Sequence, residues 1–362
     1  MSFLKSLYLR NFRNYKETEL SFSSKFNLFC GDNAQGKTNL LEAITLISTG
    51  RSFRAELLSE LISAGASFFF MEAKLEKEGI EHTVQISFDG KEKKLNLDGN
   101  NYATLQHLLG LLPSVLHAPT DSELIDGPPA LRRRFLNLHL AQRDPIYIHY
   151  LSRYWRAMKQ RNAQLKSKDL DALECWEIEM AEAAAYLLQK RFELFSELKT
   201  PLQEKGVILS GRKEVHQLHF DPSTPRSKEQ YLSALKKNRA REQQLGATLI
   251  GPHRDDFVFL VDGKPARAYA SEGQKKTATA ALRLAEWEIF KQALDAPALF
   301  GLDDIALHLD ETRQSLLSHA FETLGQVFLT ATHLPSTWQE PVGTKRFMIS
   351  AGTVQEVQVS LS

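Results

Sequence analysis

The sequence predicts an α/β protein in which a mainly helical segment interrupts a strand-rich one. The first hundred residues alternate apolar and polar positions as strands do, the middle of the chain is rich in Ala, Leu, Glu, Lys and Arg, and strand patterns return after it. The expected division is therefore a mixed-sheet lobe, lobe I, made of residues 1–115 plus 246–362. Residues 116–245 form an inserted helical lobe, lobe II.

The elements of the first lobe follow from local patterns. "LKSLYLRNF" alternates like a strand, and "KFNLFC" is a short apolar run that ends at a glycine, as a buried strand does. Apolar residues recur at intervals of three and four from Gly36 to Ile47, which predicts a helix. The stretch from residue 68 to 100 then predicts strands joined by glycine turns.

The composition is that of a soluble globular protein without a strong charge bias. Its 362 residues include 45 Lys plus Arg against 44 Asp plus Glu, so any nucleic-acid-binding surface must be local. Two cysteines, Cys30 and Cys175, do not favour a disulfide framework and suit a reducing compartment. No apolar run approaches the roughly 18 residues of a membrane span, and no signal-peptide core is visible. We expect a cytoplasmic protein with no membrane partner.

The stretch "GDNAQGKT" at residues 31–38 has the pattern of a loop that wraps phosphate. It lies between an apolar strand and an amphipathic helix, the context that such a loop needs, so a chance match is disfavoured. Lys37 is expected to reach the β- and γ-phosphates of a nucleotide, and Thr38 to coordinate Mg²⁺. The spacing excludes the dinucleotide fingerprint GxGxxG. The expected lining residues are Gly31, Asp32, Asn33, Ala34, Gln35, Gly36, Lys37, Thr38 and Asn39.

A second acidic element follows far along the chain. In "PALFGLDDIALHLD" a short apolar strand ends in Asp303 and Asp304. A P-loop hydrolase needs such an acid to hold its metal, so Asp303 is assigned to Mg²⁺, usually through water. Asp304 is assigned to positioning or deprotonating the attacking water.

A third element precedes a helix 32 residues before Asp303. Ser271, Glu272, Gly273 and Gln274 resemble the signature motif of the ABC-type ATPase superfamily. The resemblance implies that Ser271 and Gly273 meet the γ-phosphate bound to the opposite subunit; the alternative is that Ser271 only caps the helix.

Two further positions match the same superfamily. His333, at the end of an apolar strand, matches its γ-phosphate-sensing histidine, and Asp310 matches its dimer-contact aspartate. The alternatives are a polar residue at a strand end and a helix N-cap, respectively.

The sequence segments around these motifs narrow the resemblance to one family of the superfamily. "LKSLYLRNFRNY", "GDNAQGKTNLLEAI", "STGRSFR", "APTDSELIDGPPALRRRFLN", "GPHRDDFVF" and "SEGQKKTATAALRLAEW" closely resemble the RecF family of bacterial recombination mediators, from about residue 3 to residue 335. The family fold is a P-loop ABC-type ATPase head with an inserted helical lobe and no coiled coil. The resemblance implies ATP-driven dimerisation on duplex or junction DNA and weak, DNA-stimulated ATP hydrolysis. It also implies action with RecR and RecO to load RecA during gap repair and replication restart.

Several residues depart from the family pattern. Glu272 stands where Gln or Arg is usual, Lys275 where a second Gln is common, and Phe53 where a histidine is frequent. Asp304 is shorter by one methylene than the glutamate of many ABC ATPases, which suits a timing switch better than a fast motor. Asp121 lies in the segment "APTDSEL", where the family has an acidic motif. The sequence assigns no function to Asp121.

DNA is expected to contact local clusters of basic residues, because the phosphate backbone supplies most sequence-independent affinity. Arg51, Arg54, Arg132 and Arg133 are the main candidates, although consecutive arginines of a helix cannot all face one ligand. Clusters in the helical lobe are more typical of a solvated face. They comprise Arg153, Arg156, Lys159 and Arg161, and Lys236, Lys237, Arg239 and Arg241. No basic stretch is interleaved with aromatic residues, so duplex or junction DNA is favoured over single strands.

Three other functions remain to be weighed. An ABC transporter subunit would need a surface that couples it to a membrane partner, and a more complete signature motif. An SMC-type chromosome protein would need hundreds of heptad residues, whereas 234 positions separate Lys37 from Ser271. A non-catalytic module that uses ATP only to hold a dimer together is compatible with every motif.

Overall fold

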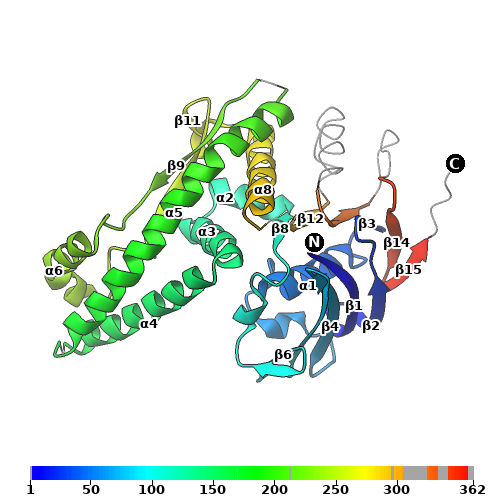
Figure 1. Ribbon diagram of the computed structural model, residues 1–362, viewed down its shortest axis with the longest axis horizontal. Coiled ribbons are helices and arrows are strands. Elements are labelled where there is room, and N and C mark those ends of the chain that lie inside the picture. Colours follow the sequence, from blue (N-terminus) through cyan, green and yellow to red (C-terminus); the bar gives the residue numbers. More distant parts are fainter. Residues whose placement is uncertain are drawn as a thin grey trace. The chain divides into compact units, whose positions relative to one another are not determined.

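The computed structural model describes residues 2–168, 170–211, 213–294, 297–304, 324–332 and 341–357. The chain divides into two units (Figure 1). Unit 1 comprises Met1–Asp121, Ile208–Ser210 and Arg283–Ser362, and unit 2 comprises Ser122–Val207 and Gly211–Leu282.

Unit 1 begins with an antiparallel sheet of strand order β2-β1-β4-β5-β6-β7. Leu7 and Leu9 of its longest strand are fully buried on one face, as the alternating pattern of the sequence predicts. The strands are β1 (Ser2–Phe12), β2 (Tyr15–Ser21), β4 (Phe69–Lys77), β5 (Ile80–Phe88), β6 (Lys93–Leu97) and β7 (Asn100–Tyr102).

The second sheet of unit 1 has the order β15-β14-β3-β13-β12-β8, and all its pairs are parallel except β14–β15. Parallel pairing brings the carboxyl ends of β3, β13 and β12 to one edge, where ligands of open α/β sheets bind. The strands are β3 (Phe26–Cys30), β8 (Ser114–His117), β12 (Leu299–Asp303), β13 (Val327–Ala331), β14 (Lys345–Ser350) and β15 (Thr353–Val357).

Helix α1 (Lys37–Thr49) shares one hydrophobic core with both sheets. Leu40 and Ile44 of α1, Leu7 of the antiparallel sheet and Phe328 of the parallel sheet are all fully buried members of that core. Gly50 ends the helix with φ 70°, a conformation that glycine adopts without strain. The core fixes α1, and with it the loop that precedes α1. Three one-turn 3₁₀ helices complete the unit: Leu58–Leu61, Leu105–Leu108 and Pro119–Ser122.

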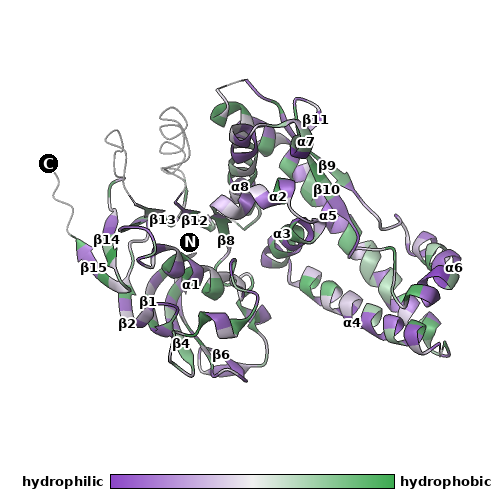
Figure 2. Cartoon of the chain, turned by 180° about the vertical axis from the view of Figure 1, so that it is seen from behind, coloured by the Kyte–Doolittle hydropathy of each residue, from purple (hydrophilic) through white to green (hydrophobic). Residues whose placement is uncertain are grey.

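Unit 2 is mainly helical. Its helices are α2 (Glu123–Asp126), α3 (Pro129–Arg143), α4 (Pro145–Ser167), α5 (Leu173–Leu209), α6 (Lys228–Leu245), α7 (Ala266–Tyr269) and the start of α8 (Glu272–Leu294). A small antiparallel sheet of β9 (His216–Asp221), β10 (Asp256–Val261) and β11 (Lys264–Pro265) joins them. Hydrophobic and hydrophilic residues alternate along α4, as expected for an amphipathic helix (Figure 2).

The unit boundary differs from the division predicted for the sequence. Residues 246–282 were expected in the first lobe, but the structure places them in unit 2. The physical reason is strand pairing: β10 pairs along its whole length with β9, so this segment belongs to the helical unit. The mixed α/β class with a helical insertion is confirmed. Among the described residues, no helix is long and apolar enough to cross a membrane.

Ion pairs are buried inside unit 2. The guanidinium of Arg161 on α4 is fully buried and lies 2.9 Å from a carboxylate oxygen of Glu177 and 2.7 Å from one of Glu242. Removing one partner of such a cluster leaves uncompensated buried charge.

We expect Arg161→Met to destabilise the protein by about 3–5 kcal/mol, because two buried carboxylates would lose their cation. Thermal or urea unfolding measures the change. Arg156→Met, at an exposed position of the same helix, is the matched control and should change stability by about 0.5 kcal/mol or less. Equal effects of the two substitutions would contradict the argument.

Candidate functional site

The glycine-rich loop joins β3 to α1 and requires glycine at two positions. Gly31 has φ 149°, and a Cβ there would collide with the carbonyl oxygen of Ile349. Gly36 has φ 122°, and a Cβ there would lie 2.7 Å from the hydroxyl of Tyr15. The loop backbone therefore packs against its supports too closely for any side chain.

Neighbouring turns hold the loop by its carbonyl groups. Asn14 Nδ2 donates to the Gln35 carbonyl at 2.8 Å, and Tyr15 Oη donates to the Gly36 carbonyl at 2.9 Å. The backbone N–H of Gly352 also donates to Gln35, at 3.0 Å. Among the described residues, no N–H group of residues 32–38 donates to a backbone oxygen. This end of α1 therefore presents N–H groups to an anion.

Lys37 lies folded over the same loop. Its ammonium donates to the carbonyl oxygens of Gly31 at 2.7 Å and Asp32 at 2.9 Å, and its side chain is buried. A lysine ammonium held at a glycine-rich loop before a helix suits the phosphates of a nucleotide.

Thr38 and Asp303 meet although 265 residues separate them. Thr38 Oγ1 donates to Asp303 Oδ1 at 2.8 Å, and Thr330 Oγ1 donates to the same oxygen at 2.8 Å. Burial raises the pKa of Asp303 above its usual range, against the hydrogen bonds from Thr330 and Thr38, which lower it. A buried carboxylate beside a threonine hydroxyl fits Mg²⁺ through oxygen ligands.

Asp304 adopts an unusual conformation beside this carboxylate. Its φ is 52°, in the left-handed region, and its N–H donates to Thr330 Oγ1 at 2.9 Å. Its Oδ1 is buried and has no hydrogen-bond partner among the described residues. Strained backbone and an unsatisfied buried oxygen are features of sites that hold a ligand or an ordered water.

Arg54 belongs to the surroundings of the loop. Its Nη1 donates to Asn39 Oδ1 at 3.0 Å, and its charge acts to lower the pKa of Asp303. Arg54 is exposed beside the nucleotide loop, and its assignment to DNA stays a prediction. Arg51, the other candidate after α1, is exposed.

The signature segment begins α8 in unit 2 with reciprocal capping bonds. The N–H of Gln274 donates to Ser271 Oγ at 3.2 Å, and the N–H of Ser271 donates to Gln274 Oε1 at 2.9 Å. Ser271, Glu272 and Gly273 are exposed. The cap leaves this segment open to solvent.

The two unusual residues of the segment pair with each other. Lys275 Nζ lies 3.1 Å from Glu272 Oε1 and 2.9 Å from Asp126 Oδ1. Glu272 and Lys275 therefore form an (i, i+3) ion pair on the first turn of α8. Phe53, the third departure, is half-buried.

Asp121, which the sequence left without a role, is the centre of a buried cluster in unit 1. Arg283 binds it through two nitrogens, at 2.7 and 3.0 Å, and His117 Nδ1 lies 2.7 Å from its Oδ2. Burial opposes ionisation of Asp121, but the charge of Arg283 and the bonds from His117 and Arg283 hold its pKa well below the usual range. His117 pairs in register with Leu302, next to Asp303.

Sequence reasoning missed Arg283. The available signal was a single cation among apolar residues in "ATAALRLAEW", a position that requires a buried partner. That partner, Asp121, lies 162 residues earlier, and no local pattern identifies it.

Arg132 is not available to DNA, contrary to the expectation from sequence. It is buried, and its guanidinium binds both oxygens of Asp256 at 2.7 and 2.9 Å and the carbonyls of Leu124 and Gly127. Arg133, the next residue, is half-buried.

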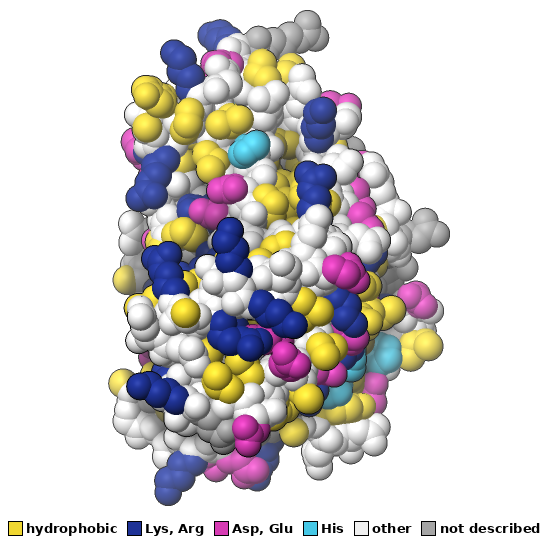
Figure 3. Space-filling model, turned by 90° about the vertical axis from the view of Figure 1, so that its left-hand side faces the viewer, with side chains coloured by type: hydrophobic (Ala, Val, Ile, Leu, Met, Phe, Trp, Pro, Cys, Tyr) yellow, Lys and Arg dark blue, Asp and Glu magenta, His cyan; other side chains and the backbone are white. Residues whose placement is uncertain are grey.

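The basic clusters of the helical lobe are largely paired. Arg153 binds Glu179 and Glu182, and Arg239 binds Glu177. Acidic side chains lie among the Lys and Arg side chains on the face seen in Figure 3. Exposed cations with no ion pair among the described residues are Arg156, Lys159, Lys237 and Arg241.

Two expected site residues, His333 and Asp310, lie outside the described residues. Within the described ranges, no three His, Cys, Asp or Glu side chains group as a metal cluster. A metal at Thr38 and Asp303 would therefore depend on water or nucleotide oxygens for its remaining ligands.

Comparisons with known proteins identify the family of this chain. Residues 3–343 match the family model described as the RecF/RecN/SMC N terminal domain. The DNA replication and repair protein RecF of Protochlamydia amoebophila is 44% identical over 91% of this chain and 94% of its own. RecF of Chlamydia caviae is 42% identical over 91% and 92%.

Solved structures give the same assignment. A structure of the recombination mediator protein RecF described as RecF-ATP has a TM-score of 0.89 and 29% identity, covering 99% of this chain and 98% of its own. The Smc head domain of Pyrococcus furiosus has a TM-score of 0.59 and 17% identity, covering 100% and 97%, and shows a shared fold. The chain belongs to the RecF family of DNA replication and repair proteins.

Proposed function

We propose that this chain binds ATP at residues Gly31–Asn39 and acts as an ATP-dependent DNA-binding protein of recombinational gap repair. The observation that carries the proposal is the contact of Thr38 with Asp303. Lys37 folds over the loop before Thr38, and among the described residues the N–H groups of residues 32–38 donate to no backbone oxygen. Support also comes from the solved relatives described as RecF-ATP and RecF-ATPrS.

In this proposal Thr38 and Asp303 hold Mg²⁺, which neutralises developing phosphate charge when bound. Lys37 orients the β- and γ-phosphates. Asp304 positions the attacking water through its unsatisfied Oδ1 and accepts its proton. His333 is assigned to sensing the γ-phosphate, from the sequence pattern alone.

The exposed signature segment supports a proposal of ATP-driven dimerisation. Ser271 and Gly273 lie at the start of a long helix whose N–H groups favour an anion. We propose that they contact the γ-phosphate bound to a second copy, so that ATP closes two heads on DNA and slow hydrolysis reopens them. RecR, RecO and RecA are the proposed partners in loading recombinase at gaps, and the cytoplasm is the proposed location.

The second candidate is a module in which ATP holds the dimer together without turnover. The short Asp304 side chain is compatible with slow chemistry, and hydrolysis stimulated by DNA distinguishes the two.

We expect ATP with Mg²⁺ to double the molar mass of the wild type in light scattering, whereas apo and ADP samples stay monomeric. Ser271→Arg should remain monomeric with ATP, because the larger side chain fills the space of the γ-phosphate. Ser233→Arg, at an exposed position of α6, should dimerise normally. A mass that never depends on nucleotide would overturn the clamp.

We expect Asp304→Asn to lower the ATPase rate about 100-fold or more while ATP binding is retained, because an amide cannot accept the proton of water. The assay compares steady-state turnover with and without DNA. Equal rates for the two proteins would favour the non-catalytic module.

The raised pKa of Asp303 predicts a pH-dependent stability. Over a range of pH the folded chain binds a proton at Asp303 that the unfolded chain does not bind. Asp303 therefore contributes to the stability of the folded chain at low pH, and this contribution is lost as the pH rises through the pKa of Asp303 in the folded state. Without nucleotide, Asp303→Asn should therefore raise Tm more at pH 7 than at pH 4. Glu56→Gln, at an exposed site, is the control. A gain in Tm that does not change with pH would contradict the assignment.

A further inference from the structure

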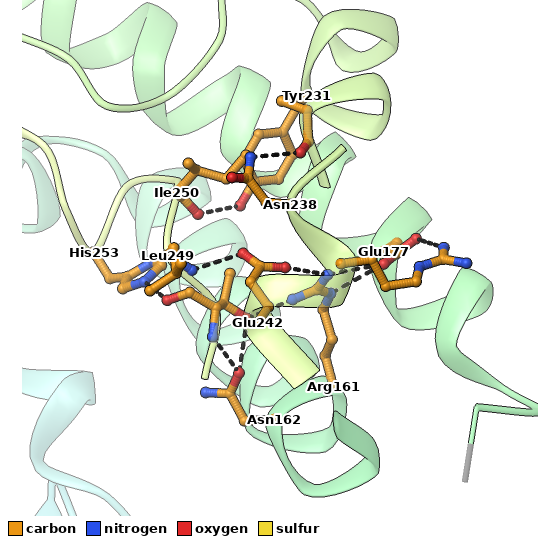
Figure 4. Close-up of polar contacts among 12 residues, drawn as sticks. Arg161, Asn162, Glu177, Tyr231, Asn238, Glu242, Leu249, Ile250 and His253 are labelled. Carbon is orange, nitrogen blue, oxygen red and sulfur yellow. Dashed lines mark hydrogen bonds and ion pairs between the residues drawn. The ribbon is translucent and has the colours of Figure 1, made fainter. Parts of the chain in front are cut away.

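Residues 246–256 of unit 2, here called the 246–256 loop, are held by hydrogen bonds from several helices (Figure 4). Glu242 accepts from the N–H of Leu249 at 2.7 Å, and Tyr231 donates to the carbonyl of Ile250 at 3.0 Å. Asn162 accepts from the N–H of Thr248 at 2.9 Å.

A Cβ at Gly251, whose φ is 126°, would collide with the hydroxyls of Tyr231 and Tyr154. The loop backbone is fixed along most of its length.

Buried arginines reinforce the same loop. Arg191 of α5 donates to the carbonyl of Pro252 at 2.8 Å and to Asp255 Oδ2 at 2.6 Å. Arg161 donates to Thr248 Oγ1 at 2.9 Å. Buried ion pairs add little stability compared with apolar packing, so their main effect here is to fix the loop in one geometry.

His253 is a half-buried residue of the loop and is held as a neutral ring. Its Nε2 donates to the carbonyl of Thr248 at 3.0 Å, so its Nδ1 accepts from the hydroxyl of Tyr154 at 2.6 Å. Burial lowers the pKa of His253 to about 4, which agrees with a neutral imidazole. The ring lies 6.4 Å from that of Trp155, whose side chain is 45% exposed.

The charges of two arginines, Arg254 and Arg133, act on His253, and neither forms an ion pair with a carboxylate among the described residues. Arg254 is exposed and makes no side-chain hydrogen bond or ion pair among the described residues. Arg133 Nη1 donates only to the carbonyl of Asp255, at 3.3 Å. Burial lowers the pKa of Arg133, the charge of Asp256 opposes this shift, and the charges of Arg191, Arg254 and Arg132 lower the pKa further. Asp256 and Asp255 are paired with Arg132 and Arg191, so Arg133 and Arg254 are cations in addition to these ion pairs.

We infer that Trp155, His253, Arg254 and Arg133, here called the His253 patch, bind a segment of single-stranded nucleic acid. Arg254 and Arg133 contact the phosphate backbone, and one unpaired base stacks on the exposed face of Trp155. Base faces are inaccessible in a duplex, so stacking on an exposed tryptophan selects unpaired nucleotides. The inference deepens the proposed DNA binding by assigning a site to the single-stranded part of a gap.

The test is fluorescence anisotropy with a labelled oligo(dT) and with a duplex of equal length, using the full chain with and without ATP. Trp155→Ala should weaken oligo(dT) binding about 10-fold, Trp155→Phe should restore most of it, and duplex binding should change less than twofold. Arg254→Ala should weaken binding and reduce the slope of log K against log salt by about 0.7, the value for one phosphate contact.

Arg241→Ala is the matched control, since this arginine is also exposed and without an ion pair among the described residues of unit 2. It should bind oligo(dT) like the wild type. Each variant is first compared with the wild type in Tm, which excludes unfolding as the cause.

Three results would overturn the inference. Trp155→Ala and Arg254→Ala could bind oligo(dT) as the wild type does, or could lose duplex binding equally. The two variants could instead lose binding of a labelled polyglutamate peptide while still binding oligo(dT). That result would assign the His253 patch to an acidic protein segment. Absence of all DNA binding by the wild type with ATP would be a failure of the proposed function itself.

Discussion

The nucleotide site depends on the hydrogen bond from Thr38 to Asp303. Thr38 follows β3 through the glycine-rich loop, and Asp303 is the last residue of β12; the two strands are not adjacent but both flank β13 in parallel. Because all three strands run in one direction, the loop before α1 and the acid that ends β12 reach the same edge. Thr330 of β13 completes the contact by donating to the same oxygen. The position of each group is thus set by the hydrophobic core that α1 shares with both sheets.

Unfavourable features concentrate at that edge. Asp303 is a buried carboxyl whose pKa is raised, and Asp304 combines a left-handed backbone with an unsatisfied oxygen. Neither feature stabilises the folded protein in the absence of a ligand, because burying a charge and burying an unpaired oxygen both oppose folding. A cation and its bound water would compensate both, so the local instability is consistent with a site that is completed by its ligands.

The parts predicted from sequence are those that local patterns encode. An apolar run, a glycine loop and a periodic helix identify β3, residues 31–36 and α1, and the same logic identifies the strand ending at Asp303. Residues 246–282 were assigned to the other lobe because the pairing of β10 with β9 depends on contacts that no local pattern reports. Arg132 and Arg133 are indistinguishable in sequence, and only Asp256, 124 residues later, decides which is buried.

The buried arginines of unit 2 position groups more than they stabilise the fold. Arg132 binds Asp256, Arg191 binds Asp255, and Arg161 binds the side chain of Thr248, so cations from three helices hold one short segment. A flexible loop would lose conformational entropy each time it bound a ligand. Since this backbone is already fixed, Arg254 is presented in a defined place, and a charged ligand there would meet an ordered surface at a smaller entropic cost.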